Sequence, residues 1–264
     1  MKDEQSAKTH APSEEFVSQA RVTAEQYEDM YRRSIEDPEG FWREHMGRVT
    51  WMKEPTKIKN TTFDYGNVDI KWFEDGTLNV AANCIDRHLA DRGDQTAIIW
   101  VPDEDDGSDQ KISYKQLAAH VNKFANVLKE MGVGRGDRVV IYLPMIPQAA
   151  YAMLACARIG AIHSVVFAGF SPDALAQRVN GSEAKVVITA DGAPRGGKVT
   201  DLKKNADKAF AKVEHDAKLL VVKRAGNEID WTEGRDHWLH EMEEGVSDEC
   251  APEEMNAEDP LFIL

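Results

Sequence analysis

The sequence predicts a doubly wound α/β domain that follows a shorter, aromatic-rich amino-terminal segment. The first observation is a series of apolar runs from residue 97 onward, and the second is that helical stretches separate most of them. Continuous apolar strands that alternate with helices are typical of a parallel sheet covered on both faces. The length of 264 residues and the hydrophobic content of 42% suffice for a sizeable core.

The amino-terminal part begins with residues 1–20, which we expect to form a mobile tail. This stretch is rich in Lys, Glu, Ser and Gln and offers little apolar surface to bury. Thr23 and Gln26 have the spacing of a capping box, which predicts the start of a helix. Asp37 followed by Pro38 predicts the start of a second helix.

A β-hairpin is expected before the regular part of the chain. Residues 68–73 alternate like a strand, Asp75-Gly76 has the chemistry of a tight turn, and residues 78–80 supply the second strand. Residues 21–83 therefore read as a separate amino-terminal module. Residues 84–264 read as the first part of the larger α/β domain, and residues 261–264 as a buried strand.

The elements of the α/β part follow from its apolar runs and its helix-start signals. The expected strands lie at residues 97–101, 139–143, 164–167, 186–189 and 219–222. Ser113 is a helix cap before Leu117, Val121, Phe124 and Leu128, which share one helical face. Pro147 and Ser171-Pro172 predict the starts of two further helices.

Charge and composition exclude several classes of function. The chain has 32 basic and 46 acidic residues and a net charge of −14, which disfavours nucleic acid and anionic membranes as partners. No apolar run approaches the roughly 20 residues that span a bilayer, and the polar start lacks a secretory signal, so we expect a cytoplasmic protein. Cys84, Cys156 and Cys250 are expected to be free thiols, the first two in the core.

A glycine-rich stretch, residues 192–199, fits the first seven positions of a nucleotide phosphate loop. The eighth position fails, because Val199 has no hydroxyl for magnesium, and Pro194 has no N–H for phosphate. Arg195 and Lys198, which flank Gly196-Gly197, could instead clamp a single phosphate group. Physical reasoning leaves this clamp and a solvated basic loop equally open.

The remaining candidates carry less chemistry. Gly169 follows an expected strand and would allow a ligand to approach the backbone closely, although the residues alone favour a helix cap with core phenylalanines at this junction. The acidic stretch 103–107 is interpreted as a solvated loop rather than a calcium site. His237 and His240 read as surface residues, so we expect no metal site and no catalytic residue.

The chain resembles the acetyl-coenzyme A synthetases, a branch of the acyl-adenylating superfamily, from Val22 to Leu264. Four segments carry the resemblance: residues 70–79, 82–88, 142–172 and 256–264. The resemblance implies an AMP-forming ligase that joins acetate and ATP to acetyl-AMP and then transfers the acetyl group to coenzyme A. It also implies that Arg195–Lys198 binds the 3′-phosphate and adenine end of coenzyme A, with Gly169 near the pantetheine arm.

The resemblance has two departures. Lys198 stands where the family commonly has arginine, which keeps the charge and loses the planar fork. Relatives continue after a segment like residues 260–264 into a loop that binds ATP phosphates, so the sites for ATP, magnesium and acetate are expected outside these 264 residues. The chain alone is therefore predicted to be inactive.

Three alternatives stay open at this point. The first is a propionyl-CoA synthetase of the same family, and the second is a phosphate-loop nucleotide hydrolase built around Lys198. The third is a complete, non-catalytic module that binds a nucleotide or coenzyme A. The expected partners are small molecules in the leading interpretation, and the sequence does not indicate the oligomeric state.

Overall fold

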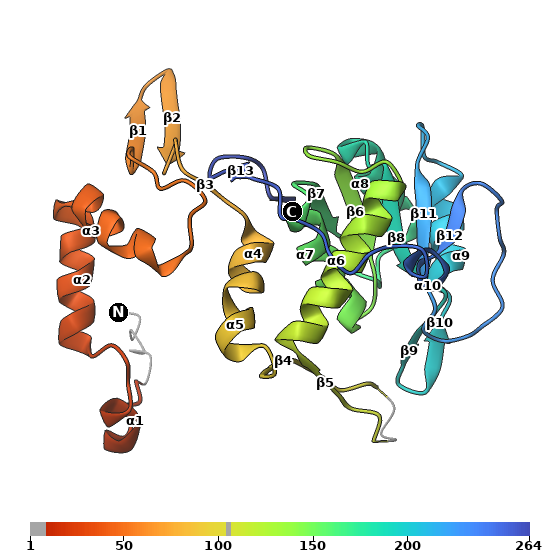
Figure 1. Cartoon of the computed structure of the whole chain (residues 1–264), viewed down its shortest axis with the longest axis horizontal. Helices are drawn as coiled ribbons and strands as arrows, with labels where there is room; N and C mark the ends of the chain where they lie inside the picture. The colour runs from red at the N-terminus through yellow and green to blue at the C-terminus, as the bar shows by residue number, and fades with distance from the viewer. Residues whose placement is uncertain (1–8, 104–106) are drawn as a thin grey trace, which may run out of the picture. The chain divides into compact units, whose positions relative to one another are not determined.

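A computed structural model describes residues 9–103 and 107–264 (Figure 1). The chain forms two compact units. One comprises the residues up to Val49 together with Ile58–Lys71, and the other comprises Thr50–Lys57 together with Trp72–Leu264. This division passes through the predicted module of residues 21–83, and that module stays a prediction.

The smaller unit begins with helices whose starts were predicted. The Thr23 side chain and Gln26 form the reciprocal hydrogen bonds of a capping box, and Asp37 accepts a hydrogen bond from the Gly40 N–H at 3.0 Å. A short helix, α1, also forms within the segment expected to be a tail, whereas residues 1–8 of that segment lie outside the described residues. The helices are α1 (Glu14–Ser18), α2 (Ala24–Glu36) and α3 (Pro38–His45), followed by a 3-10 turn (Met46–Arg48).

The predicted hairpin across Asp75-Gly76 is wrong. Strand β2 (Asn67–Trp72) pairs with β1 (Lys59–Asp64), and the turn between them contains Gly66 at a φ of 81°. Strand β3 (Thr77–Leu78) pairs instead with β13 (Met255–Asn256). The Asp75 carboxylate has another role, because it accepts hydrogen bonds from Thr56 and Lys57.

A six-stranded sheet in the larger unit confirms the α/β prediction. Its order is β12-β11-β8-β6-β7-β14, and every neighbouring pair is parallel. Its central strands are almost fully buried, as expected for a sheet covered on both faces. The bounds are β6 (Arg138–Tyr142), β7 (Ile162–Val165), β8 (Val186–Ala190), β11 (Lys218–Val222), β12 (Asp236–Trp238) and β14 (Phe262–Ile263).

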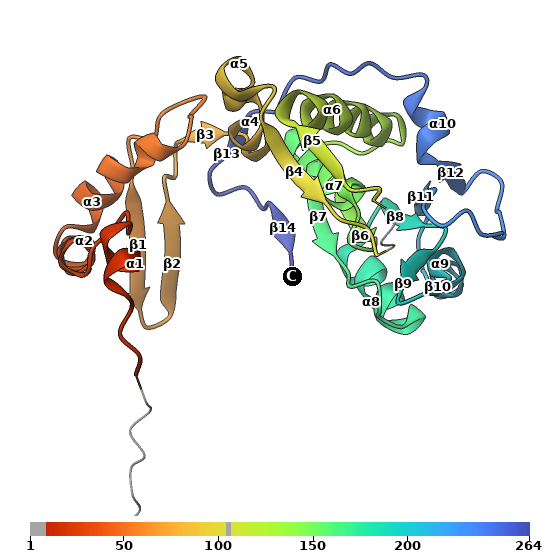
Figure 2. The same cartoon turned by 90° about the horizontal axis from the view of Figure 1, so that it is seen from below.

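Helices cover the two faces of this sheet. Figure 2 shows α6 on one side and α8 with α9 on the other. Helix α6 packs against α7 and the short α10, while α8 packs against α9. Ser113 caps α6 as predicted, in a capping box with Gln116. The bounds are α6 (Tyr114–Glu130), α7 (Pro147–Arg158), α8 (Pro172–Ser182), α9 (Leu202–Phe210) and α10 (Leu239–Glu243).

Two predicted strands occupy other places than expected. The run at residues 97–101 forms β4 (Thr96–Trp100), which pairs antiparallel with β5 (Gln110–Ser113) outside the six-stranded sheet. The run at residues 261–264 contains β14, whose Phe262 is 49% exposed. It is not buried because β14 lies at the sheet edge and pairs only with β7 among the described residues.

A buried corner links the start of the larger unit to its end. The Asn79 side-chain amide, at the start of α4 (Val80–Cys84), lies within 3.1 Å of the carbonyl oxygens of Ala157, Arg158 and Glu253. The buried Arg158 guanidinium donates two hydrogen bonds, of 2.8 and 2.9 Å, to the Asp86 carboxylate. Two short helical turns complete this region, a 3-10 turn (Asp86–His88) and α5 (Leu89–Arg92).

The cysteines are free, as predicted, but they differ in exposure. Cys156 and Cys250 are buried, whereas Cys84 is exposed, so the prediction that Cys84 belongs to the core is wrong. Burial raises the pKa of the Cys156 thiol to about 12. None of the helices within the described ranges has both the length and the apolar character needed to cross a bilayer.

Candidate functional site

The strand order identifies the carboxyl ends of the central strands as the place to look for a ligand. Strands β7, β6, β8, β11 and β12 lie side by side in that order, so the chain reverses its direction of progress between β6 and β8. In open α/β sheets, ligands commonly bind outside the carboxyl ends of the strands at such a switch point. The loops that follow β6, β8 and β11 lie at the carboxyl ends of these strands.

The glycine-rich stretch after β8 is a β-hairpin. Strands β9 (Ala193–Arg195) and β10 (Lys198–Thr200) pair antiparallel, with Lys198 directly opposite Arg195. Gly196 and Gly197 form the two-residue turn with φ angles of 58° and 72°, a left-handed conformation that favours glycine. The chain thus turns back into a strand instead of entering a helix, which contradicts the phosphate-loop alternative.

The hairpin holds two cations close together at an exposed tip. Directly opposed residues in an antiparallel pair have Cα atoms only about 4.5–5.5 Å apart. Arg195 and Lys198 are both exposed, and neither takes part in an ion pair with another described residue. The structure therefore brings together the four consecutive residues predicted to bind a phosphate.

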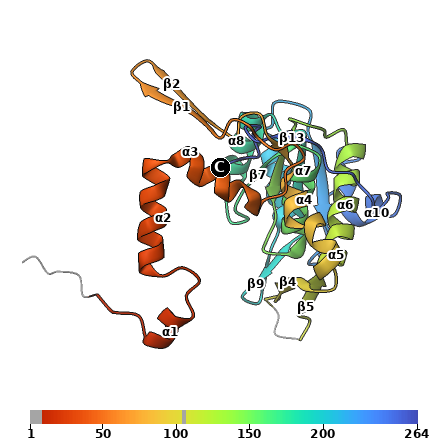
Figure 3. The same cartoon turned by 60° about the vertical axis from the view of Figure 1, so that its left-hand side comes forward.

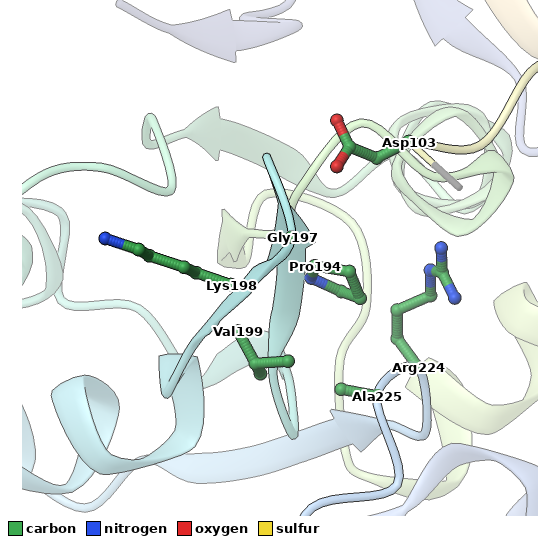
Figure 4. Close-up of a pocket in the computed structure, with 7 residues that line it drawn as sticks. All are labelled: Asp103, Pro194, Gly197, Lys198, Val199, Arg224 and Ala225. Atoms are coloured by element: carbon green, nitrogen blue, oxygen red, sulfur yellow. The ribbon is translucent and has the colours of Figure 1, made fainter. Parts of the chain in front are cut away.

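A shallow pocket of about 380 Å³ lies on one side of the hairpin. Figure 4 shows Arg224 beside Pro194, whereas Lys198 points to the opposite side. The Arg224 guanidinium also lies over the Trp100 ring, 5.3 Å from its centroid. The lining residues are Asp103, Pro194, Gly197, Lys198, Val199, Arg224 and Ala225.

Asp191 fixes the loop that carries Arg224, and sequence reasoning missed it. Its buried carboxylate accepts the backbone N–H groups of Gly192, Arg224, Ala225 and Gly226 at 2.7–2.9 Å. These bonds attach the loop after β11 to the end of β8. The signal in the sequence was an aspartate directly between an apolar strand and a glycine, a position where a carboxylate can bind loop N–H groups.

The hairpin tip already contacts a carboxylate from another loop. The Gly196 N–H donates a hydrogen bond of 2.6 Å to Oδ2 of Asp103, which follows β4. Figure 3 shows the ends of β4 and β5 near β9. The central part of the acidic stretch that was interpreted as a solvated loop, residues 104–106, lies outside the described residues.

Gly169 lies in a different loop from the hairpin. It follows β7 in a turn closed by a 2.9 Å hydrogen bond from the Phe170 N–H to the Phe167 carbonyl. Strand β6 lies between β7 and β8, so about two strand spacings, roughly 10 Å, separate the two loops at the sheet edge. A Cβ at Gly169 would approach the Phe167 ring to 2.5 Å. The structure thus places Gly169 at the carboxyl ends of the strands, like the hairpin, but outside the pocket.

A buried cluster of charges lies directly after the hairpin in the chain. Lys203 of α9 is fully buried, and its Nζ lies 2.7 Å from Asp207 and 2.9 Å from Asp236. Arg235 pairs with both carboxylates, at 2.5 and 2.6 Å. Burial acts to raise the pKa of Asp236, but hydrogen bonds from Arg235, the Thr232 N–H and Lys203 outweigh it and hold that pKa below its usual value. The charged side chains of this cluster thus pair with one another.

Metal binding finds no support in the residues that the structure describes. No group of three or more His, Cys, Asp or Glu side chains in that part of the chain is arranged to hold a metal ion. His237 and His240 do not form such a group. The exposed Arg195 and Lys198 side chains and the N–H groups of the turn between them are groups that can bind an anion.

Comparison with known proteins agrees with this fold. The family model described as AMP-binding enzyme matches residues 85–264, and the one described as acetyl-coenzyme A synthetase N-terminus matches residues 27–84. An acetoacetyl-CoA synthetase from Streptomyces lividans superposes with a TM-score of 0.83 at 24% identity, over 96% of this chain and 40% of that chain. That likeness concerns the fold alone.

Curated relatives are much closer in sequence. Acetyl-coenzyme A synthetase of Vibrio cholerae is 56% identical over 98% of this chain, and that of Bradyrhizobium diazoefficiens is 59% identical over 95%. The chain spans 38% of the length of each. These matches confirm the resemblance drawn from the sequence. The chain belongs to the AMP-binding enzyme family, and its first part matches the acetyl-coenzyme A synthetase N-terminus.

Proposed function

We propose that this chain is part of an AMP-forming acetate:CoA ligase, which makes acetyl-CoA from acetate, ATP and coenzyme A through acetyl-AMP. Support comes from the 54–59% identity to relatives that carry the name acetyl-coenzyme A synthetase. The three free cysteines fit a reducing compartment such as the cytoplasm. Small molecules are the partners that this activity requires.

These 264 residues alone are proposed to be catalytically silent. The glycine-rich stretch is a hairpin rather than a loop around a triphosphate, and the described residues provide no cluster for magnesium. ATP, magnesium and acetate would then be bound by groups outside this chain. ATP–pyrophosphate exchange by the isolated chain should remain at background, and robust exchange would contradict this proposal.

We further propose that the hairpin binds the 3′-phosphate of coenzyme A. The observation that carries this proposal is the direct cross-strand pairing of Arg195 with Lys198 around a Gly196-Gly197 turn. A guanidinium can donate two parallel hydrogen bonds to a phosphate, and an ammonium adds a point charge. The glycines let the phosphate approach the turn N–H groups, which can themselves bind anions.

Gly169 is proposed to border the path of the pantetheine arm. Both loops lie beyond the carboxyl ends of parallel strands, so an extended ligand could pass from one to the other along the sheet edge. A side chain at Gly169 would displace the Phe167 ring and alter this path. Gly169→Val should therefore weaken the binding of coenzyme A and of its 3′-dephospho form to a similar extent.

Calorimetry that compares coenzyme A with 3′-dephospho-coenzyme A tests the phosphate site. We expect coenzyme A to bind about tenfold more tightly, and Arg195→Ala or Lys198→Ala to remove most of this difference, since each deletes one charged contact. Lys204→Ala is the matched control, because Lys204 is an exposed lysine on α9. Equal affinities of the two ligands for the unaltered chain would remove Arg195 and Lys198 from this role.

A further inference from the structure

The contact between Asp103 and the hairpin tip has a consequence for ligand binding. Oδ2 of Asp103 accepts the Gly196 N–H at 2.6 Å, although the two residues lie 93 positions apart in the chain. Asp103 is exposed and lines the same pocket as Gly197 and Lys198. The Asp103 carboxylate therefore contacts the turn that joins the strands of Arg195 and Lys198.

A carboxylate and a phosphate compete for the same kind of partner. Both are oxyanions that accept hydrogen bonds from backbone N–H groups and attract Arg and Lys. The tip offers such a set in Arg195, Lys198 and the Gly196 N–H, and Asp103 already uses the last of these. A phosphate that approached the tip would meet this carboxylate.

We propose that Asp103 is an internal competitor that the 3′-phosphate of coenzyme A must displace from the hairpin tip. This inference rests on the proposed phosphate site and adds a residue that sets its affinity. With Asp103 in place the tip carries two positive charges and one negative charge, and a dianionic phosphate is repelled by the carboxylate. A ligand without the 3′-phosphate escapes this repulsion.

The location of Asp103 makes displacement inexpensive. Asp103 follows β4, and the β4–β5 pair lies outside the six-stranded sheet. The Asp103 side chain is exposed, and its hydrogen bond to the described residues is the one to the exposed Gly196 N–H, so moving it breaks a bond at the surface. Since surface charges are screened by water and salt, the competition should change affinity moderately and weaken at high ionic strength.

Calorimetry on the 264-residue chain with coenzyme A and 3′-dephospho-coenzyme A tests the inference. Asp103→Asn keeps the size and one acceptor but removes the charge, and Asp103→Ala removes both. We expect both variants to bind coenzyme A roughly three- to tenfold more tightly and the dephospho form unchanged. Asp109→Asn, in the same exposed stretch, makes an identical change of charge and should leave both affinities within about twofold.

The outcomes separate this inference from the proposed function. If the unaltered chain prefers coenzyme A and loses that preference in Arg195→Ala, while Asp103→Asn gains no affinity, only the competition by Asp103 is overturned. If the unaltered chain does not distinguish the two ligands, the phosphate site and the competition both fall. Tightening of both ligands in Asp103→Asn would also overturn the competition, because it would show an effect unrelated to the phosphate.

A spectroscopic measurement checks displacement directly. The amide resonance of Gly196 reports the loss of its bond to Asp103, with adenosine 3′,5′-bisphosphate as the probe. Without the probe, the resonance should differ between the unaltered chain and Asp103→Ala; at saturation, the two positions should coincide because the phosphate has replaced the carboxylate. Different saturated positions would show that Asp103 stays in place and would overturn the proposal.

Discussion

Two neighbouring lysines in this chain have opposite surroundings. Lys198 lies at the exposed hairpin tip beside Arg195, whereas Lys203 is fully buried between the carboxylates of Asp207 and Asp236. The buried cluster contains its own anions. Among the described residues, Asp103 accepts a hydrogen bond from the Gly196 N–H of the hairpin and forms no ion pair with Arg195 or Lys198.

Charged side chains thus serve two purposes in this chain. The buried ones stabilise the fold, and the exposed ones are available to bind a ligand. Taking charges out of water is costly, so a buried cation needs fixed anions and hydrogen bonds around it. Exposed cations remain hydrated, and they become useful when an external anion arrives. Lysine content alone therefore does not locate a binding site; the partners of each lysine do.

The largest expected effect comes from breaking the buried cluster. Lys203→Met should lower the free energy of unfolding by about 3–5 kcal/mol, because it leaves Asp236 buried without one of its cations. Urea denaturation followed by circular dichroism measures this loss. The exposed neighbour Lys204→Met serves as the control and should change stability by less than about 0.5 kcal/mol. A loss under 1 kcal/mol for Lys203→Met would remove the distinction between the two lysines.

A somewhat smaller effect is expected at Asp191, whose carboxylate attaches the loop after β11 to the end of β8. Asp191→Ala removes the acceptor for four backbone N–H groups and should cost about 2–3 kcal/mol. The control is Asp216→Ala, an exposed aspartate just before β11, which should be nearly neutral. Equal stabilities of the two variants in urea denaturation would show that the loop of Arg224 is held by other contacts.

Acid should affect the buried cluster more than the hairpin. The folded-state pKa of Asp236 lies below its unfolded value, so its ionised form contributes stability above the unfolded pKa of about 3.9. That contribution disappears as the pH falls through this value toward the folded-state pKa. Stability measured from pH 6 to pH 3 should therefore fall less steeply in Asp236→Asn than in Asp216→Asn, which retains the cluster. Parallel curves would contradict this role.

The smallest effect on stability is expected at the hairpin itself. The double variant Arg195→Ala and Lys198→Ala should unfold within about 0.5 kcal/mol of the unaltered chain, because its side chains are exposed. Its consequence should appear in binding, where the preference for coenzyme A over the dephospho form is lost. In the unaltered chain, this preference should decline with added salt as screening increases. A preference that does not respond to salt would indicate recognition by shape.

The sequence predicted the sheet well because its buried strands are continuous apolar runs. The runs at 139–143, 186–189 and 219–222 all lie in the six-stranded sheet. It was harder to predict which strands pair with each other, because residues 97–101 have a similar apolar pattern but pair with β5 in a separate sheet. Apolar pattern indicates that a strand forms and carries little information about which strand lies beside it.

The candidate site was predicted in part for a similar reason. Arg195 and Lys198 were visible because a glycine pair separates them within a few residues. Asp103 and Arg224 reach the same pocket from distant loops, and only the fold brings them there. Lys203 was missed because nothing around a lysine in the sequence names the distant carboxylates that will surround it, whereas Asp191 had a local signal in its place between an apolar strand and a glycine.

The corner around Asn79 limits where this protein can be cut for study. The boundary between the two family models falls between residues 84 and 85, which makes Ile85 an attractive first residue for a shortened version. Such a version would lose the amide that lies against the carbonyls of Ala157, Arg158 and Glu253. A chain that began at the boundary between the two family models would thus expose to water these three carbonyl groups, which belong to later parts of the folded domain.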